Sequence, residues 1–488
     1  MTLLDPTRLA STLYAGSDRR ASAEADIVAA ASGAPLGRIA MAGADDLDAA
    51  VHALSQGQRR WAAASQAERA GVLLRAADLL LANAAELVDW YVKEAGCTVG
   101  YSYFQLEIGA QSLRAAAALT TEPVGELFPS APGRLSLSRR APVGVVGVIA
   151  PFNSPLYLAL RSIAPALALG NAVVVKPDPR TAVTGGAVIA EILFQAGLPR
   201  DVVAVLPGDG ELGAALVSHP KVPVIAFTGS TGAGRRIAVA AAEQMKRVHL
   251  ELGGNSPLVV FDDVDLDRAA SAGAFGSFMH SGQICMASSR HLVHASIAED
   301  YVSRLVQRAE RLVVDDPAVN PAAMIGPLID ARQRDGVAAI VDATIAAGAV
   351  AATGASYDGL LYRPTVLTGV TPGMPAYDRE IFGPVAPVTV FDTIDEAVSL
   401  VNDTDYGLSV GVLTADIARG LAFADRVHSG NVHINDQTLV DDVVQPFGGF
   451  KASGNGSRVG SARYNADAFT EQQWVTVRPD VAPYPYYD

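Results

Sequence analysis

The chain has 488 residues, of which 50% are hydrophobic and 18% are charged, and its formal net charge is −14 at pH 7. The apolar content excludes a disordered chain, and the acidic charge argues against a nucleic-acid-binding protein, which needs a basic surface. No apolar run reaches the roughly 18–20 residues that cross a bilayer, and residues 1–12 lack a signal-peptide pattern, so we expect a soluble, cytoplasmic protein.

Helices are expected over the N-terminal part of the chain, about residues 1–100. Apolar residues recur there at three- and four-residue spacing, most clearly across 67–96, and Gly96 is typical of a helix end. Residues 103–119 predict another helix. The Pro- and Gly-rich stretch 120–144 then breaks the pattern, and its alternating part predicts an exposed hairpin strand.

From residue 143 onward, short Val- and Ile-rich runs alternate with helical segments. This alternation is typical of a parallel sheet that helices cover on both faces. The expected strands are 143–152, 171–179, 202–210, 222–230 and 248–254, and the expected helices between them are 158–170, 181–197, 211–219 and 235–245.

The same α/β texture resumes after Gly254 and predicts a second α/β domain. Its strands and helices are expected within 256–261, 267–280, 291–312, 387–391, 394–402 and 407–414. Residues 472–479 predict one late strand, which would pair either with the earlier hairpin or with another subunit.

A G-x-G-x-x-G pattern follows the strand at 202–210 and is formed by Gly208, Gly210 and Gly213. This is the dinucleotide-binding fingerprint, but taken alone it is weak. Lys176 lies at the end of another strand, where α/β folds bind ligands. It could contact ribose or phosphate oxygens, or be an ordinary solvated lysine.

A stronger nucleotide-binding candidate lies in residues 227–234, "FTGSTGAG", after a strand and at the start of a helix. Backbone amides and the helix dipole could hold a phosphate there, with hydroxyls adding further donors. The alternative is an ordinary helix N-cap formed by Ser230 or Thr231. The residues concerned are Gly229, Ser230, Thr231 and Gly234.

One cysteine, one glutamate and one asparagine match the needs of aldehyde oxidation. That reaction requires a nucleophile, a general base, an oxyanion donor and a hydride acceptor. Cys285, Glu251 and the side-chain amide of Asn153 supply the first three. Each also has a structural alternative. Cys285 could be a small buried hydrophobic residue, Glu251 an exposed strand end, and Asn153 a turn cap.

Metal chemistry is not expected. The only two cysteines are Cys97 and Cys285, and the chain contains no HExxH or CxxC pattern. Two cysteines cannot form a disulfide framework or close a zinc site by themselves.

Seven segments, in order, resemble motifs of the aldehyde dehydrogenase superfamily: "APFNSP", "VVVKP", "FTGSTGAG", "LELGGNSP", "GQICMASSR", "EIFGPV" and "PFGGFKASGNG". The resemblance implies an α/β fold with two Rossmann-like domains, one nucleotide-binding and one catalytic, and a β-hairpin arm that pairs subunits into homodimers or homotetramers. The implied boundaries are 1–121 with 143–253, 254–452, and 122–142 with 468–488.

The resemblance also assigns roles. Cys285 would be the nucleophile, Glu251 the base that activates the deacylating water, and Asn153 an oxyanion-hole donor, whereas Cys97 would be core filler. The cofactor would be NAD, with NADP as the open alternative. The residues expected around it are Lys176, Asp178, Gly208, Gly210, Gly229, Ser230, Thr231, Gly234, Leu252, Glu380 and Phe382.

A finer resemblance, in residues 171–186, 433–438, 449–460 and 469–479, is to NAD-dependent benzaldehyde dehydrogenases and their vanillin and salicylaldehyde relatives. It implies an aromatic aldehyde as the small-molecule substrate. The alternatives are an aliphatic aldehyde, or a cysteine-dependent acyl hydrolase or transferase without hydride transfer.

Two departures from the family pattern affect these expectations. Pro179 replaces a common ribose-binding glutamate, so Asp178 could keep NAD preferred or Arg180 could admit NADP. Arg161 replaces a common tryptophan and Ser154 a common aromatic residue. Arg161 could bind polar groups on a substrate ring or belong to a structural ion pair.

Overall fold

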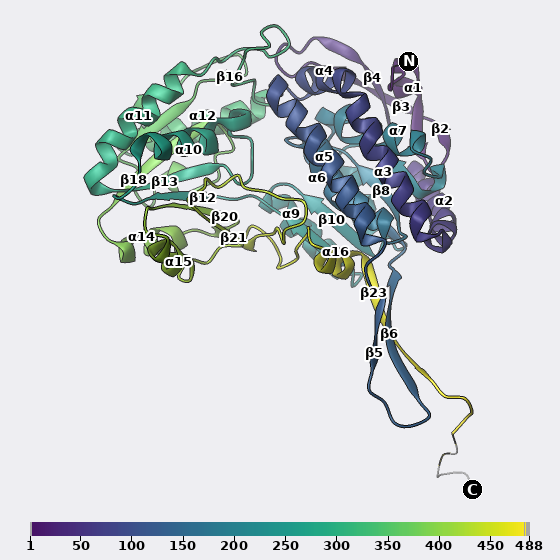
Figure 1. Cartoon of the computed structure of the whole chain (residues 1–488). Helices are drawn as coiled ribbons and strands as arrows, with labels where there is room; N and C mark the ends of the chain where they lie inside the picture. Colours follow the sequence, from purple (N-terminus) through teal and green to yellow (C-terminus); the bar gives the residue numbers. More distant parts are fainter. Residues whose placement is uncertain (1, 483, 485–488) are drawn as a thin grey trace.

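The computed structural model describes residues 2–482 and 484, and it contains two large parallel-rich sheets and a projecting three-stranded sheet (Figure 1). The first large sheet has the strand order β11-β10-β7-β8-β9-β1-β2, and its five strands from β11 to β9 are parallel. Their bounds are β11 (Arg247–Glu251), β10 (Val224–Thr228), β7 (Val145–Ile149), β8 (Ala172–Lys176) and β9 (Val203–Val205). These five strands confirm the predicted strand-and-helix alternation.

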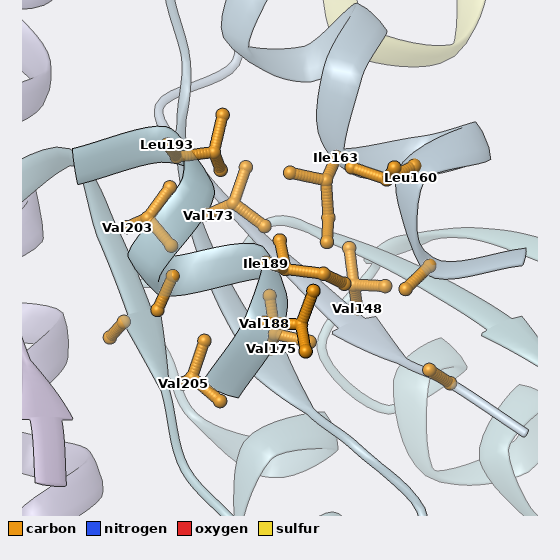
Figure 2. Close-up of a cluster of buried hydrophobic side chains, with 14 of the residues drawn as sticks. Val148, Leu160, Ile163, Val173, Val175, Val188, Ile189, Leu193, Val203 and Val205 are labelled. Atoms are coloured by element: carbon orange, nitrogen blue, oxygen red, sulfur yellow. The ribbon is translucent and has the colours of Figure 1, made fainter. Parts of the chain in front are cut away.

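Helices cover the first sheet because its central strands carry apolar side chains toward both faces. On one side, valines of β7, β8 and β9 pack against isoleucines and leucines of α6 and α7 (Figure 2). The helices of this part are α2 (Ala44–Ala63), α3 (Gln66–Ala82), α4 (Ala84–Glu94), α5 (Val99–Leu119), α6 (Pro155–Ala168), α7 (Val188–Gln195), α8 (Gly210–Ser218) and α9 (Thr231–Ala242).

The prediction of helices throughout residues 1–100 is wrong for the first part of that range. After the short helix α1 (Pro6–Ser11), the chain forms β1 (Thr12–Ala15), β2 (Asp18–Arg20), β3 (Ala23–Val28) and β4 (Pro35–Met41). β1 adds antiparallel to the sheet edge at β9, and β3 pairs with β4. β2 and β3 are largely exposed, and β4 buries the adjacent Ile39 and Ala40, so no apolar alternation marks these strands.

The second large sheet has the order β14-β17-β18-β13-β12-β20-β21, and only its β14–β17 pair is antiparallel. Its strands are β14 (Val350–Thr353), β17 (Thr365–Thr368), β18 (Val385–Phe391), β13 (Ser288–His294), β12 (Ser256–Val260), β20 (Ser409–Leu413) and β21 (Asn431–Ile434). Its helices are α10 (Leu266–Phe278), α11 (Ala298–Arg311), α12 (Ala331–Ala346), α13 (Pro375–Asp378), α14 (Ile394–Asn402) and α15 (Ile417–Ala424). Two small pairs complete this part, β15 (Tyr357–Asp358) with β16 (Leu361–Tyr362) and β19 (Tyr406–Gly407) with β22 (Phe450–Lys451).

The projecting sheet joins the predicted hairpin to the predicted late strand (Figure 1). It contains β5 (Gly125–Phe128), β6 (Leu135–Pro142) and β23 (Thr470–Val477), which follows α16 (Ala462–Phe469). β23 pairs antiparallel with β6 of the same chain, so the first of the two predicted partners is found. Residues 483 and 485–488 of the predicted arm lie outside the described residues.

None of the helices within residues 2–482 and 484 has the length and apolarity that membrane crossing requires.

Candidate active site

A cavity of about 600 Å³ lies between the two large sheets and collects most of the sequence-predicted site residues. It opens at the ends of β7, β8, β10 and β11, because the carboxyl ends of parallel strands meet at one edge of a sheet. The predicted residues that line it are Asn153, Lys176, Asp178, Gly229, Ser230, Glu251, Leu252, Cys285, Glu380 and Phe382.

Cys285 follows the short helical turn η4 (Met279–Gly282) and precedes β13. Burial, together with the nearby carboxylates of Glu380 and Glu251, raises the pKa of its thiol to about 12. At neutral pH the group is therefore a thiol, and it must lose its proton when it attacks. Cys97 differs, because it is fully buried in the hydrophobic core and does not line the cavity.

Asn153 reaches the turn that carries Cys285 from the loop after β7. Its side-chain Nδ2 donates a hydrogen bond of 2.8 Å to the backbone carbonyl of Gln283, and the residue is buried. An amide nitrogen carries two hydrogens, so the second can donate to a ligand in the cavity. The geometry suits a fixed hydrogen-bond donor beside the cysteine.

Glu251 is the last residue of β11 and is 8% exposed. Neither carboxylate oxygen has a hydrogen-bond partner among the described residues. Burial raises the pKa of this carboxyl to about 8, although the charges of Arg161 and Arg458 lower it in part. A buried, unpartnered carboxyl with such a pKa can take up and release a proton near neutral pH.

Lys176 is the last residue of β8, where it is largely buried, and burial lowers the pKa of its ammonium group. Its Nζ donates to the carbonyl of Pro177 at 3.2 Å, which leaves further donors for a ligand. Within the G-x-G-x-x-G segment, Gly213 approaches this lysine, since a Cβ built there would lie 3.6 Å from the lysine Cδ. Gly208 and Gly210 do not line the cavity.

The loop before α9 contributes Gly229 and Ser230 to the cavity. Ser230 is the N-cap of α9, and its Oγ accepts a hydrogen bond of 3.4 Å from the amide of Ala233. Thr231 faces away, donating to the carbonyl of Ala452 and lining a separate hollow of about 400 Å³. A Cβ built at Gly234 would lie 2.4 Å from Leu252, so this glycine allows helix and strand to pack closely.

Glu380 lies across the cavity from the first sheet. Its Oε1 accepts a hydrogen bond of 3.0 Å from the amide of Gly254, and burial raises its pKa to about 7. A Cβ built at Gly253 would lie 2.2 Å from its Oε2, so that close approach requires glycine. Phe382 has a φ of 53° and packs edge-on against Phe152, with ring centroids 5.8 Å apart.

The free donors and acceptors at this end of the cavity fit a dinucleotide. Lys176 and the loop at 229–230 offer donors for phosphate and ribose oxygens, and the Glu380 carboxylate offers acceptors for ribose hydroxyls. Cys285, Asn153 and Glu251 lie in the same cavity.

Comparison with known proteins agrees with this arrangement. The Aldehyde dehydrogenase family model matches residues 18–475. The chain belongs to the aldehyde dehydrogenase family.

Individual relatives of this aldehyde dehydrogenase match over nearly their whole length. The chain is 52% identical to a vanillin dehydrogenase of Amycolatopsis sp., covering 100% of both chains, and 46% identical to a benzaldehyde dehydrogenase [NAD(+)] of Pseudomonas putida, covering 95% of both. Its fold resembles that of a salicylaldehyde dehydrogenase from Pseudomonas putida G7 complexed with salicylaldehyde, with a TM-score of 0.94, 34% identity and coverage of 98% and 99%. The predicted family and fold class are confirmed.

Sequence reasoning missed one ionic contact of this aldehyde dehydrogenase at the cavity wall. The Arg180 guanidinium donates to both carboxylate oxygens of Asp178, at 2.9 and 2.8 Å, and to Asp330 at 2.6 Å. It also lies over the ring of Phe152, 4.2 Å from the centroid. In the structure, Asp330 is the N-cap of α12.

Arg161 forms the structural ion pair that was one of its two predicted alternatives. Its guanidinium pairs with Asp441, both side chains are buried, and Tyr157 donates to the same carboxylate at 2.9 Å. The guanidinium also lies over the ring of Phe447, 4.4 Å from the centroid. The Arg161 charge lowers the pKa of Glu251, whereas the Asp441 charge raises it.

Proposed function

We propose that this aldehyde dehydrogenase oxidises an aromatic aldehyde, such as benzaldehyde, to its carboxylic acid with NAD as the hydride acceptor. The observation that carries the proposal is the convergence of Cys285, Asn153 and Glu251 on one cavity. The substrate class is supported by the relatives named for vanillin and benzaldehyde, at 52% and 46% identity.

In the proposed first step, the Cys285 sulfur attacks the aldehyde carbonyl and forms a thiohemiacetal. The oxyanion accepts hydrogen bonds from the Asn153 Nδ2 and the Cys285 backbone amide, which stabilise the developing charge. The pKa of about 12 means that the thiol proton must pass to solvent water as the bond forms.

Bound NAD would supply the acceptor for the hydride that leaves the thiohemiacetal carbon. That loss leaves a thioester on Cys285. Glu251 then removes a proton from a water that attacks the thioester carbonyl, and the carboxylic acid departs as Glu251 passes that proton to the Cys285 sulfur and the thiol is restored. Glu251 is suited to this role because its carboxylate has no competing hydrogen bond among the described residues.

We assign the cofactor to the Lys176 end of the cavity. Lys176 would contact the adenosine ribose, Gly229 and Ser230 the pyrophosphate, and Glu380 the nicotinamide ribose. Leu252, Gly234 and Phe382 would complete the walls of this site by packing, and Thr231 and the 208–210 turn would support it from outside. Asp178 favours NAD over NADP, since its negative charge repels a 2′-phosphate and its partner Arg180 is already held by two carboxylates.

We also propose the domain boundaries 1–121 with 143–253 for nucleotide binding, 254–452 for catalysis, and 122–142 with 468–488 for oligomerisation. The three-stranded arm exposes large apolar side chains, including Leu127 at 75% and Trp474 at 72%. Such side chains suit burial against a second copy of the chain, as a homodimer or homotetramer. A cytoplasmic location is part of the same proposal.

The test is the initial rate of NADH formation with benzaldehyde, vanillin and a straight-chain aldehyde, each with NAD and NADP. Efficient NAD reduction with the aromatic aldehydes, abolished in Cys285→Ala, is the expected result. Preference for the straight-chain aldehyde would reject the substrate class. Thioester hydrolysis without any nucleotide reduction would instead support the acyl hydrolase alternative.

A further inference from the structure

The turn before Cys285 has an unusual backbone. His280 has φ 50° and ψ 40°, Ser281 has φ 54° and ψ 30°, and Gly282 has φ 68°. Left-handed conformations are unfavourable for residues with a side chain, and they persist only where the surroundings hold them. The structure must therefore hold this turn from outside.

Several contacts hold Ser281 and its neighbours in place. The Ser281 Oγ donates to the carbonyl of Gly326 at 2.8 Å, and the Gln283 Oε1 accepts from the amide of Ile329 at 3.0 Å. A Cβ built at Gly282 would lie 2.1 Å from the carbonyl oxygen of Gly383, so the backbone passes there without room for a side chain.

The His280 ring makes a different set of contacts, on the side of Asn153. It stacks on the ring of Tyr101 with centroids 4.2 Å apart and planes 9° apart. The Tyr101 hydroxyl lies 2.6 Å from the Oγ of Ser154. The imidazole is thereby fixed against the loop that carries the Asn153 side chain.

Packing alone does not explain a histidine at this position. The side chain is 5% exposed, and its Nε2 has no hydrogen-bond partner among the described residues. An unpartnered buried polar atom costs free energy. Burial lowers the pKa of the ring to about 4, so His280 is neutral at neutral pH and acts through contacts rather than charge.

We propose that His280 is a positioning residue that fixes the relative positions of the two oxyanion-hole donors, the Asn153 Nδ2 and the Cys285 backbone amide. His280 stacks on Tyr101, and the Tyr101 hydroxyl contacts Ser154, the neighbour of Asn153. The Asn153 Nδ2 donates to the Gln283 carbonyl at 2.8 Å, and the Gln283 amide donates to the His280 carbonyl at 3.1 Å. This closed set of contacts ties the Asn153 amide to the turn that ends in the Cys285 backbone amide. The inference rests on the roles of Asn153 and Cys285 proposed above.

The experiment compares two reactions of Cys285 in the full-length His280→Asn variant. Asparagine tolerates the left-handed backbone, so the substitution removes mainly the ring. Single-turnover NADH formation from benzaldehyde is expected to fall by about 10–100-fold, since a small misplacement of a catalytic donor has that effect. Alkylation of Cys285 by iodoacetamide should keep its rate, because it builds no oxyanion.

The matched control is His291→Asn. His291 is equally buried, burial lowers its pKa to about 4, and its ring lies 2.7 Å from both Ser277 Oγ and Tyr301 OH, outside the cavity. This control is expected to lower the melting temperature, but it should not reduce NADH formation relative to alkylation of Cys285. If His280→Asn does not fold, Tyr101→Leu, which removes the stacking partner, should give the same separation.

A double-variant cycle tests whether the loss of NADH formation in His280→Asn acts through Asn153. In an Asn153→Ala background, His280→Asn should cause little further loss of NADH formation. A full additional loss, or equal losses of NADH formation and alkylation in the single variant, would overturn the proposal. Absence of NADH formation in the wild-type protein would instead reject the proposed function, which makes the two failures distinguishable.

Discussion

Arg180 and Asp330 connect the parts of the chain that contain the two large sheets, at the wall of the proposed cofactor cavity, with Arg180 Nη1 lying 2.6 Å from Asp330 Oδ2. Arg180 follows β8 of the first sheet, whereas Asp330 begins α12 of the second part. The contact therefore depends on the tertiary structure. It engages the Arg180 guanidinium, which would otherwise be available to an anionic ligand.

Asp330→Asn is expected to raise kcat/KM for NADP relative to NAD by several-fold. The substitution releases one guanidinium donor for a 2′-phosphate, while the amide oxygen can still cap α12 through its bond with the amide of Gln333. Stability should change by less than about 1 kcal/mol, since the pair is partly exposed. Steady-state kinetics with both nucleotides measures the ratio.

The matched control is Asp335→Asn on the same helix. Asp335 pairs with its neighbour Arg334 on the surface and does not line the cavity, so the nucleotide ratio should not move. An unchanged ratio in Asp330→Asn as well would show that Arg180 does not take part in nucleotide selection.

Glu251 predicts the pH dependence of turnover. Because water activation needs the carboxylate and burial raises its pKa to about 8, the steady-state rate should rise with pH through about 8. In Glu251→Gln the steady-state rate should be low and should not rise with pH, and a burst of NADH should precede the steady state. A burst that falls in proportion to the steady-state rate would contradict the assigned role.

The same shift predicts a change in stability. Since the folded-state pKa of Glu251 lies above its ordinary value, the carboxyl favours the folded state most at low pH, and this advantage disappears as pH rises through about 8. Glu251→Gln should therefore stabilise the protein more at pH 9 than at pH 5, relative to wild type. Denaturant unfolding at the two pH values measures this, and equal effects would exclude a raised pKa.

A substitution at Leu127 tests whether the three-stranded arm pairs subunits. Leu127 is 75% exposed on β5 of the three-stranded sheet, so Leu127→Asp should place a charge in a subunit interface and shift the protein toward monomers. Light scattering after size exclusion measures the mass. Val319→Asp is the control, because Val319 is 78% exposed outside the arm. No change in mass with Leu127→Asp would remove this face from the interface.

The sequence predicts the central strands of both sheets because continuous Val- and Ile-rich runs have few alternatives in an α/β chain. The same approach fails for β3, whose pattern of exposed residues gives no periodic signal. It also cannot find Asp441 beside Arg161 or Asp330 beside Arg180, since those partners are separated by 280 and 150 residues. Motifs identify the candidate catalytic and binding residues, whereas long-range packing decides which acidic residues pair with Arg161 and Arg180.

The most direct test of the proposed chemistry is the intact mass of Glu251→Gln after mixing with benzaldehyde and NAD, followed by acid quench and peptide mapping. Because the variant should form the thioester but hydrolyse it slowly, a single benzoyl group is expected on the peptide that contains Cys285, and none without NAD. NADH formation with no acyl group at Cys285, or an acyl group on another residue, would contradict the assignment of Cys285 as the nucleophile.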